Sequence, residues 1–436
     1  MPDAATMIAV IGGAVGVVGG GSGLIGCWRV WRQEHREEHH AFFASYEKSI
    51  ATLERQCERE TDAAKKEEKK QRLEALESEY VEQQEAYRQN TALRQAAPRG
   101  VLVADRPPRP EAVVAELREL LEKTRGLSPA LLTVEDHWLR GNSLYELERY
   151  DEALKEYNAA LALRPDDATA LYNRGTVLDQ LNRYEEALAD FNRSLELRPD
   201  DPQTLDNRGT ALAGLKRYEE ALADHNRSLQ LRPDHPAALN NRGATLLDLD
   251  RYEEALADVN RAVELRPDDP AMLNNRGVAL HGLKRYDDAL ADHNRSLQLR
   301  PDDPDTLNNR GIVLRRLKRY DDAIADHNRS LEIRPDHPDV LNNRGVTLRH
   351  LERYEDALAD FNRSLELQPD DPDALYNRAC LFSLGDRYED ALADLREAIA
   401  RDAKYRRMAR EDEDFEGLRN DPKWGPKFRE LVETEE

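Results

Sequence analysis

The chain has 436 residues and a formal net charge of −22, from 86 acidic and 64 basic side chains. This acidity argues against nucleic acid as a partner, because binding phosphates requires a basic face. Only 39% of the residues are hydrophobic and 34% are charged, which suits helices that each bury one stripe and disfavours a single large enzyme core. Cys27, Cys57 and Cys380 are too far apart in sequence for a disulfide framework or a zinc site. We therefore expect a reducing compartment and no bound metal.

The first feature in chain order is an uncharged stretch over residues 7–28. A helix of this length spans roughly 30 Å, about the thickness of a bilayer core. Arg29 and Arg32 follow the stretch while only Asp3 precedes it, and positive charge marks the cytoplasmic side of a membrane segment. The stretch therefore predicts a transmembrane anchor of a single-pass membrane protein, with the C-terminal body facing the cytoplasm.

Other interpretations of this stretch are also open. A cleaved signal peptide needs basic residues before the apolar segment, and none is present. The residues ending at Cys27 resemble a lipobox, in which the cysteine is lipidated. A G-x-G-x-x-G pattern begins at Gly21, but a dinucleotide site needs a βαβ unit and a charged helix follows instead. Gly12, Gly16 and Gly20 have the spacing of residues that let two helices associate in lipid, or they only lower the hydrophobicity of the anchor.

A charged segment, a linker and a short helix follow. Residues 33–95 lack glycine and proline and are rich in Glu, Lys, Arg and Gln, as in long continuous helices. Apolar residues recur there at spacings of three and four, which predicts a coiled-coil stalk that would join chains into a homo-oligomer, or a solvated single helix. Prolines over residues 96–110 predict a linker, and residues 111–133 predict an N-terminal capping helix.

The remainder of the chain is an internal repeat of 34 residues. Proline, glycine and tyrosine each recur at this interval in seven or eight places. The prolines are Pro165, Pro199, Pro233, Pro267, Pro301, Pro335 and Pro369, and the glycines are Gly141, Gly175, Gly209, Gly243, Gly277, Gly311 and Gly345. Three independent columns of this length exclude coincidence.

Numbered from Val134, the repeat resembles the tetratricopeptide repeat, with leucine at position 4, glycine at 8, tyrosine at 17, alanine at 20 and proline at 32. The resemblance covers eight copies over residues 134–405 and implies an all-α solenoid of helix-turn-helix units wound into a right-handed superhelix. Small residues such as Gly175 lie where the two helices of a unit would cross, and Asp201 can cap the next helix. Residues 406–436 resemble the closing segment of many bacterial arrays of this family and predict a C-terminal cap.

A column of asparagines is the main candidate binding feature. Position 6 is asparagine in seven successive copies: Asn173, Asn207, Asn241, Asn275, Asn309, Asn343 and Asn377. An amide has donors and an acceptor and can bind peptide backbone whatever its side chains. The column resembles the asparagine ladder in the repeat domain of O-linked N-acetylglucosamine transferase, which implies a peptide-binding groove. The alternative is that each asparagine only binds the neighbouring repeat.

Two further sets of side chains need an interpretation. Arg315, Arg316, Arg349 and His350 form a basic cluster at positions 12 and 13, which is either a receptor for an acidic side chain or C-terminus or a solvated face. The two-carboxylate clamp of this family is not supported, because position 6 is never basic. Position 24 is histidine in three copies, and we expect core packing there because phenylalanine fills the column elsewhere. Asp190 and Arg193 are expected to pair at i,i+3.

The sequence therefore predicts a membrane-anchored scaffold that binds an extended peptide or a partner protein in the concave face of the array. The alternative is an oligomeric structural spacer whose repeats only stack. An enzyme is disfavoured, since no nucleophile elbow, phosphate loop or metal spacing is present outside the repeats. No cofactor is expected.

Overall fold

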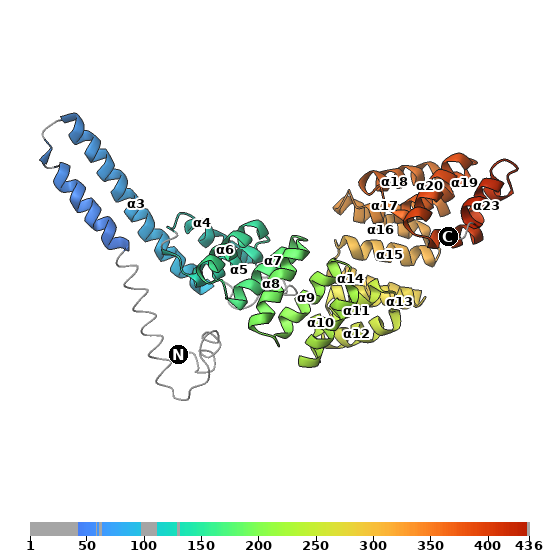
Figure 1. Cartoon of the computed structure of the whole chain (residues 1–436), viewed down its shortest axis with the longest axis horizontal. Coiled ribbons are helices and arrows are strands. Elements are labelled where there is room, and N and C mark those ends of the chain that lie inside the picture. Colours follow the sequence, from blue (N-terminus) through green and yellow to red (C-terminus); the bar gives the residue numbers. More distant parts are fainter. Residues whose placement is uncertain (1–41, 58, 61–62, 97–110, 129–130, 434–436) are drawn as a thin grey trace. The chain divides into compact units, whose positions relative to one another are not determined.

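The computed structural model describes residues 42–57, 59–60, 63–96, 111–128 and 131–433, and every regular element in these ranges is helical. The chain divides into two compact units, one ending at Leu231 and the other beginning at Arg232. Within each unit, successive helices pair and the pairs pack side by side (Figure 1).

Each repeat consists of a 13-residue helix, here helix A, and a 14-residue helix, here helix B. The first unit contains α3 (Ala63–Ala96), α4 (Glu111–Lys123), α5 (Val134–Glu146), α6 (Tyr150–Leu163), α7 (Ala168–Gln180), α8 (Tyr184–Leu197), α9 (Pro202–Gly214) and α10 (Tyr218–Leu231). The second contains α11 (Pro236–Asp248), α12 (Tyr252–Leu265), α13 (Pro270–Gly282), α14 (Tyr286–Leu299), α15 (Pro304–Arg316), α16 (Tyr320–Ile333), α17 (Pro338–His350), α18 (Tyr354–Leu367), α19 (Pro372–Leu384) and α20 (Tyr388–Arg401). The predicted all-α array of eight helix-turn-helix repeats is confirmed.

The ends of the helices follow from the repeated turn residues. The side chain of Asp201 accepts a hydrogen bond from the backbone N–H of Thr204 at 2.9 Å, and Pro202 occupies the first turn of α9. This is the expected cap, because a carboxylate satisfies an N–H that has no partner within the helix. The turn from helix A to helix B contains in every repeat one residue with φ between 55° and 60°: Glu148, Asn182, Lys216, Asp250, Lys284, Lys318, Glu352 and Asp386.

Glycine at position 8 is required by the side chain at position 24. A Cβ atom at Gly175 would lie 2.7 Å from the ring of Phe191, and one at Gly277 would lie 2.5 Å from Cε1 of His293. The histidines of this column, His225, His293 and His327, are fully buried, so their assignment to the core is confirmed. The helices therefore cross at a distance that only glycine permits beneath a ring.

The two helices of each repeat are also joined by an ion pair. Nε of Arg174, at position 7, donates to Asp190 at position 23 over 2.7 Å, and Nη2 donates to the other carboxylate oxygen over 2.6 Å. The expected pairing of Asp190 with Arg193 is wrong, because Arg193 pairs with Asp166 and Glu196. Position 7 forms this pair in all eight repeats, with Glu156 replacing aspartate in the first.

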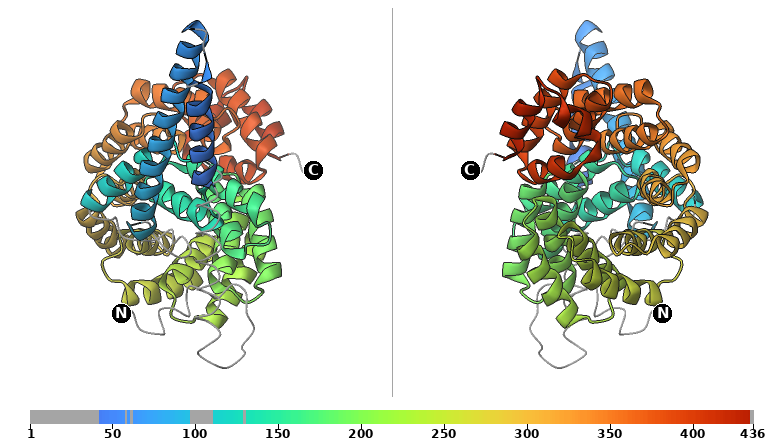
Figure 2. Two further views of the ribbon diagram at one scale, coloured as in Figure 1. Left: turned by 90° about the vertical axis from the view of Figure 1, so that its left-hand side faces the viewer. Right: turned by 90° about the vertical axis from the view of Figure 1, so that its right-hand side faces the viewer.

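Residues 33–95 do not form one continuous helix in their described part. A helix over residues 42–57 and α3 lie side by side (Figures 1 and 2). The Tyr46 hydroxyl donates to Glu79 at 2.6 Å, and the ring of Phe43 lies 5.8 Å from that of Tyr80. The apolar residues expected to form a coiled coil between chains therefore pack within one chain.

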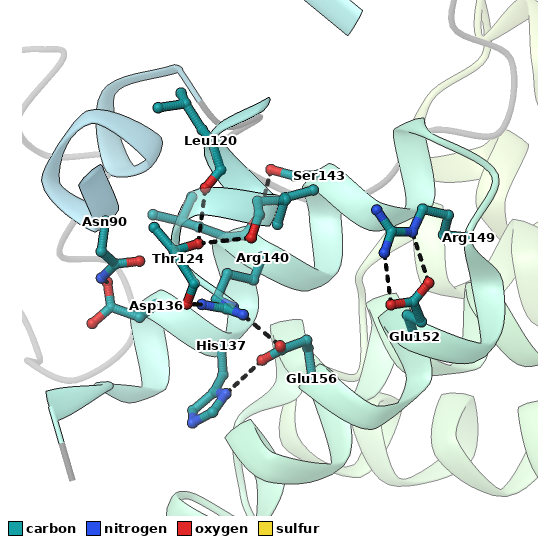
Figure 3. Close-up of polar contacts among 12 residues, drawn as sticks. Asn90, Leu120, Thr124, Asp136, His137, Arg140, Ser143, Arg149, Glu152 and Glu156 are labelled. Carbon is teal, nitrogen blue, oxygen red and sulfur yellow. Dashed lines mark hydrogen bonds and ion pairs between the residues drawn. The ribbon is translucent and has the colours of Figure 1, made fainter. Parts of the chain in front are cut away.

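The N-terminal helices cover the first repeat (Figure 3). His137, which replaces the leucine of position 4, bonds to Oε2 of Glu156 at 2.7 Å, and Nε of Arg140 donates to Oε1 at 3.0 Å. Nη1 of Arg140 donates to the carbonyl oxygen of Thr124 at 3.1 Å, which ties the end of α4 to α5. The apolar residues of this junction are Leu93, Leu117, Leu120, Leu121, Leu139 and Leu144.

The C-terminal residues cover the last repeat. They form α21 (Lys404–Glu411), the short 3-10 helix η2 (Glu413–Phe415), α22 (Glu416–Asn420) and α23 (Gly425–Glu433). Tyr405, Phe415, Leu418, Phe428 and Val432 are buried against α19 and α20. Since a solenoid exposes an apolar face at its last repeat, this segment removes that face from water.

The predictions of a transmembrane helix and of a single-pass membrane protein with cytoplasmic repeats are corrected. No helix in the described part of the chain is long and apolar enough to cross a membrane. Repeat helices of 13 or 14 residues are too short, and α3, with 34 residues, is too densely charged. The stretch expected as the anchor, residues 7–28 with Gly12, Gly16 and Gly20, lies outside the described residues.

Candidate functional site

The asparagines of position 6 form hydrogen bonds between successive repeats. In the second unit, Nδ2 of each such asparagine from Asn275 onwards donates to Oδ1 of the position-5 asparagine in the preceding repeat. The pairs are Asn275 to Asn240 at 2.9 Å, Asn309 to Asn274 at 3.2 Å, Asn343 to Asn308 at 3.2 Å and Asn377 to Asn342 at 3.0 Å. The column therefore links the A helices from α11 to α19 through side-chain amides.

The first unit uses the same donors with other acceptors. Nδ2 of Asn207 donates to the hydroxyl oxygens of Tyr172 and Thr176 at 2.9 and 3.1 Å. Nδ2 of Asn173 donates to Oδ1 of Asn142 at 3.1 Å, and Asn173 is fully buried. Asn173 therefore has no surface to offer a ligand, unlike the half-buried Asn207 and Asn241.

The amide oxygens of the position-6 asparagines from Asn275 to Asn377 have no hydrogen-bond donor among the described residues. Asn275, Asn309, Asn343 and Asn377 are half-buried, and no hydrogen bond among the described residues ends on Oδ1 of any of them. Because Nδ2 is held by the preceding repeat, each carbonyl group is fixed in direction. The arrangement is a row of preorganised acceptors, and backbone N–H groups are the commonest donors that could meet it.

The basic cluster predicted from positions 12 and 13 comes together at the C-terminal ends of α15 and α17. Arg315 is half-buried and Arg316 is exposed. Arg349 forms an ion pair with Asp414 of the C-terminal segment, so it already has a carboxylate partner. The ring of His350 stacks on Tyr320, with ring centres 5.4 Å apart and planes 17° apart.

The charges of this cluster act on one another. Burial and the like charges of Arg316 and Arg349 lower the pKa of Arg315 to about 10. Burial and the same arginines lower the pKa of His350. His281, at position 12 of α13, also has a lowered pKa, from burial and then from Arg316 and Arg315. The cluster thus extends over three successive A helices. His281 occupies position 12 of the repeat before Arg315. Comparing position 12 between successive repeats of the sequence would therefore have identified it as part of the basic cluster.

One group of described residues brings metal-ligand atoms within 4.8 Å of one another: Cys380, Asp412 and Asp414. Burial raises the pKa of the Cys380 thiol well above its usual value, which favours the protonated form. The Tyr376 hydroxyl donates to Asp412 at 2.7 Å, and Arg349 pairs with Asp414. These contacts join α17 and α19 to the C-terminal segment, and the arginine supplies the positive charge that a cation would bring.

Comparison with known proteins identifies the repeat. Models of the tetratricopeptide repeat match residues 139–202, 200–268, 268–336, 302–369 and 336–411, together well over half of the chain. A curated relative, the Hsp70-Hsp90 organising protein of Plasmodium falciparum, is 36% identical over 52 residues. That match spans 12% of this chain and 9% of the relative.

A solved structure shows the same fold, and a second is similar over part of the chain. The crystal structure of the APC/C hetero-tetramer Cut9-Hcn1 matches 72% of this chain and 59% of its own, at 16% identity and a TM-score of 0.54. A tetratricopeptide repeat protein from Parabacteroides merdae matches 54% of this chain and 93% of its own, at 20% identity and a TM-score of 0.45. Proteins with this repeat are generally scaffolds for protein–protein interaction. The repeat pattern, the helix pairs and the matches over residues 139–411 agree, and this chain belongs to the tetratricopeptide repeat family.

Proposed function

We propose that this chain is a non-catalytic interaction scaffold that binds an extended segment of a partner protein along its A helices. The asparagines at position 6 of the second unit, from Asn241 to Asn377, would contact the backbone of that segment, and the cluster around Arg315 and Arg316 would contact its side chains. The family supports a protein as the class of partner. The matched relative, named for organising Hsp70 and Hsp90, supports the same class.

The row of unused amide oxygens carries this proposal. An extended peptide presents backbone N–H groups at regular intervals and irrespective of its side chains. Asn275, Asn309, Asn343 and Asn377 present acceptors at one position of successive repeats, each oriented by its Nδ2 bond. A preorganised acceptor costs little conformational entropy when the ligand arrives, so even half-buried carbonyls would contribute to affinity.

The alternative function is a structural spacer whose repeats only stack. The hydrogen bonds from each position-6 asparagine to the preceding repeat favour it, because they give the column a structural use without any ligand. The two functions differ in the role of the amide oxygen. The scaffold needs Oδ1 to accept hydrogen bonds from a peptide, whereas the spacer needs only the Nδ2 bond between repeats.

A binding measurement on the full chain separates them. An array of unrelated peptides would be probed with the wild type and with the double variant Asn309→Ala and Asn343→Ala. We expect the wild type to bind a subset of peptides and the variant to lose at least about tenfold in affinity, the value of one strong hydrogen bond. The matched control is Asn274→Ala with Asn308→Ala.

The control breaks the same two hydrogen bonds between repeats but keeps Asn309 and Asn343. Binding that survives in the control and is lost in the test variant supports the scaffold. Equal loss in both variants, in step with a lower thermal midpoint, would show that the column is structural. A wild type that binds no peptide would exclude the proposal.

A further inference from the structure

Arg315 and Arg316 are exceptional among the arginines of their own repeat. Other arginines there are paired with carboxylates: Arg310 with Asp326 at 2.6 Å, Arg319 with Asp322 at 2.7 Å, Arg329 with Asp302 at 2.7 Å and Arg334 with Asp305 at 3.1 Å. Neither the Arg315 side chain nor the Arg316 side chain forms a hydrogen bond or an ion pair with any residue that the structure describes. In a chain with 86 acidic side chains, two adjacent unpaired guanidinium groups indicate that their partner comes from another molecule.

Burial makes this lack of partners costly for the isolated chain. Nε of Arg315 is shielded from solvent and has no partner, and the same holds for Nε2 of His281. A buried donor without an acceptor destabilises the folded state. The positive charges of Arg316 and Arg349 also repel the charged form of Arg315. No carboxylate is among the groups that counteract this repulsion. An incoming carboxylate would offset the repulsion among these charges.

Capping of the helix dipole does not explain the cluster. Basic residues in the last turn of a helix interact favourably with its C-terminal carbonyl groups. However, the last turns of α5, α7, α9, α11 and α19 contain none, and those helices have the same length and the same turn. The basic residues are confined to α13, α15 and α17, which are consecutive A helices.

We propose that the ends of α13, α15 and α17 bind an acidic segment of a partner protein, with its Asp or Glu carboxylates paired to Arg315 and Arg316. His281 and His350 would flank these pairs, and Tyr320, stacked under His350, would contact the aliphatic part of the segment. The inference rests on the proposed function, because the segment would enter along the same A helices. It adds the chemical class of ligand.

The surrounding charge selects among anions. A planar guanidinium group binds a carboxylate through two parallel hydrogen bonds. Nucleic acid offers similar oxygens, but a long polyanion would meet the repulsion of a chain with a net charge of −22. A short acidic segment places its few charges at the cluster alone. We therefore assign the site to a carboxylate-bearing peptide.

The test compares two blocked peptides on the full chain by isothermal titration. One is made of aspartates and glutamates, and the other replaces them with asparagines and glutamines, so the backbone and size are conserved. We expect the acidic peptide to bind at least about tenfold more tightly at low salt, and this preference to shrink as salt is added. Arg316→Gln, an exposed position with no side-chain hydrogen bond or ion pair to the described residues, should remove most of the preference, and Arg315→Gln with Arg316→Gln should remove all of it.

The control for charge is Arg329→Gln with Arg363→Gln, two exposed arginines on α16 and α18 of the same unit. It removes two positive charges, as Arg315→Gln with Arg316→Gln does, and should keep the preference. If the control loses as much of the preference as Arg315→Gln with Arg316→Gln, or if both peptides bind alike, the acidic site is excluded while peptide binding stands. If neither peptide binds, nor any peptide of the array, the proposed function fails as well. Tighter binding of a short single-stranded oligonucleotide than of the acidic peptide would also overturn the assignment.

Discussion

Nδ2 of Asn343 donates a hydrogen bond to Oδ1 of Asn308, 3.2 Å away in the preceding repeat. This contact orients the Asn343 amide, whose oxygen accepts no hydrogen bond from the described residues. The same asparagine thus serves the packing of repeats and leaves one atom for a ligand. The two uses are compatible because an amide has separate donor and acceptor atoms.

The glycine of position 8 should tolerate no Cβ where the facing side chain is a ring. Gly311→Ala places a methyl group 2.6 Å from Cε1 of His327, so we expect a loss of about 1–3 kcal/mol from overpacking. Thermal and denaturant unfolding of the full chain would measure it. The eighth repeat is the control, since Ala379 and Leu395 occupy positions 8 and 24 there and are buried in one cluster, so Ala379→Gly should cost only about 1 kcal/mol. Equal effects at both positions would contradict this account.

Acid should destabilise the array through its core histidines. Burial is the main cause that lowers the pKa of His293 and of His327 to about 3, against 6.5 for an unfolded histidine. The unfolded chain therefore binds more protons below pH 6.5, so stability is complete above that pH and falls as the pH drops towards 3. The contribution of each ring is roughly 5 kcal/mol at most, at 1.36 kcal/mol for each pKa unit.

Replacing both histidines by phenylalanine, which occupies the same position in other repeats, tests the direction of this pH dependence. His293→Phe with His327→Phe should move the acid unfolding midpoint, followed by circular dichroism, to lower pH. The reverse change, Phe361→His, should move it to higher pH. An acid midpoint that does not respond to either variant would show that other groups control acid unfolding.

The buried pair between positions 7 and 23 should be worth more than the exposed pair between positions 16 and 19. Asp360 accepts two hydrogen bonds from Arg344, at 2.7 and 2.6 Å, and its side chain is 9% exposed. Asp360→Asn leaves the guanidinium group without its counter-charge, and we expect a loss of about 3 kcal/mol. Asp356→Asn, which removes an exposed partner of Arg353 in the same repeat, should cost under about 1 kcal/mol. Chemical denaturation would compare them, and similar losses would refute the distinction.

The turn between helices A and B should favour glycine. Lys284 has a φ of 58°, where a side chain is strained and glycine is not. We expect Lys284→Gly to stabilise the chain by up to about 1 kcal/mol and Lys284→Val to destabilise it by about 1–2 kcal/mol. A thermal midpoint that falls with both substitutions would disprove the strain.

Much of the architecture could be predicted from the residues alone. The interval between Gly175 and Gly209 defines the repeat, and Asp201 with Pro202 places the start of a helix, because caps and turns depend on neighbours in sequence. The composition of residues 33–95 predicted helix correctly in the described part of that range. It did not predict that the helix over residues 42–57 and α3 lie side by side, because no glycine or proline separates them in the sequence.

The partners of the side chains were decided by the tertiary structure. Arg174 and Asp190 are 16 residues apart, and Asn343 and Asn308 are 35 apart, so no local rule joins them. Arg315 and Arg349 both occupy position 12, so the sequence does not distinguish them. In the folded chain, the C-terminal segment places Asp414 next to Arg349, whereas Arg315 has no carboxylate partner among the described residues. The sequence determines which helices form, because helix signals are local. Whether a polar side-chain atom has a hydrogen-bond partner depends on the distances between helices, which are set only in the folded chain.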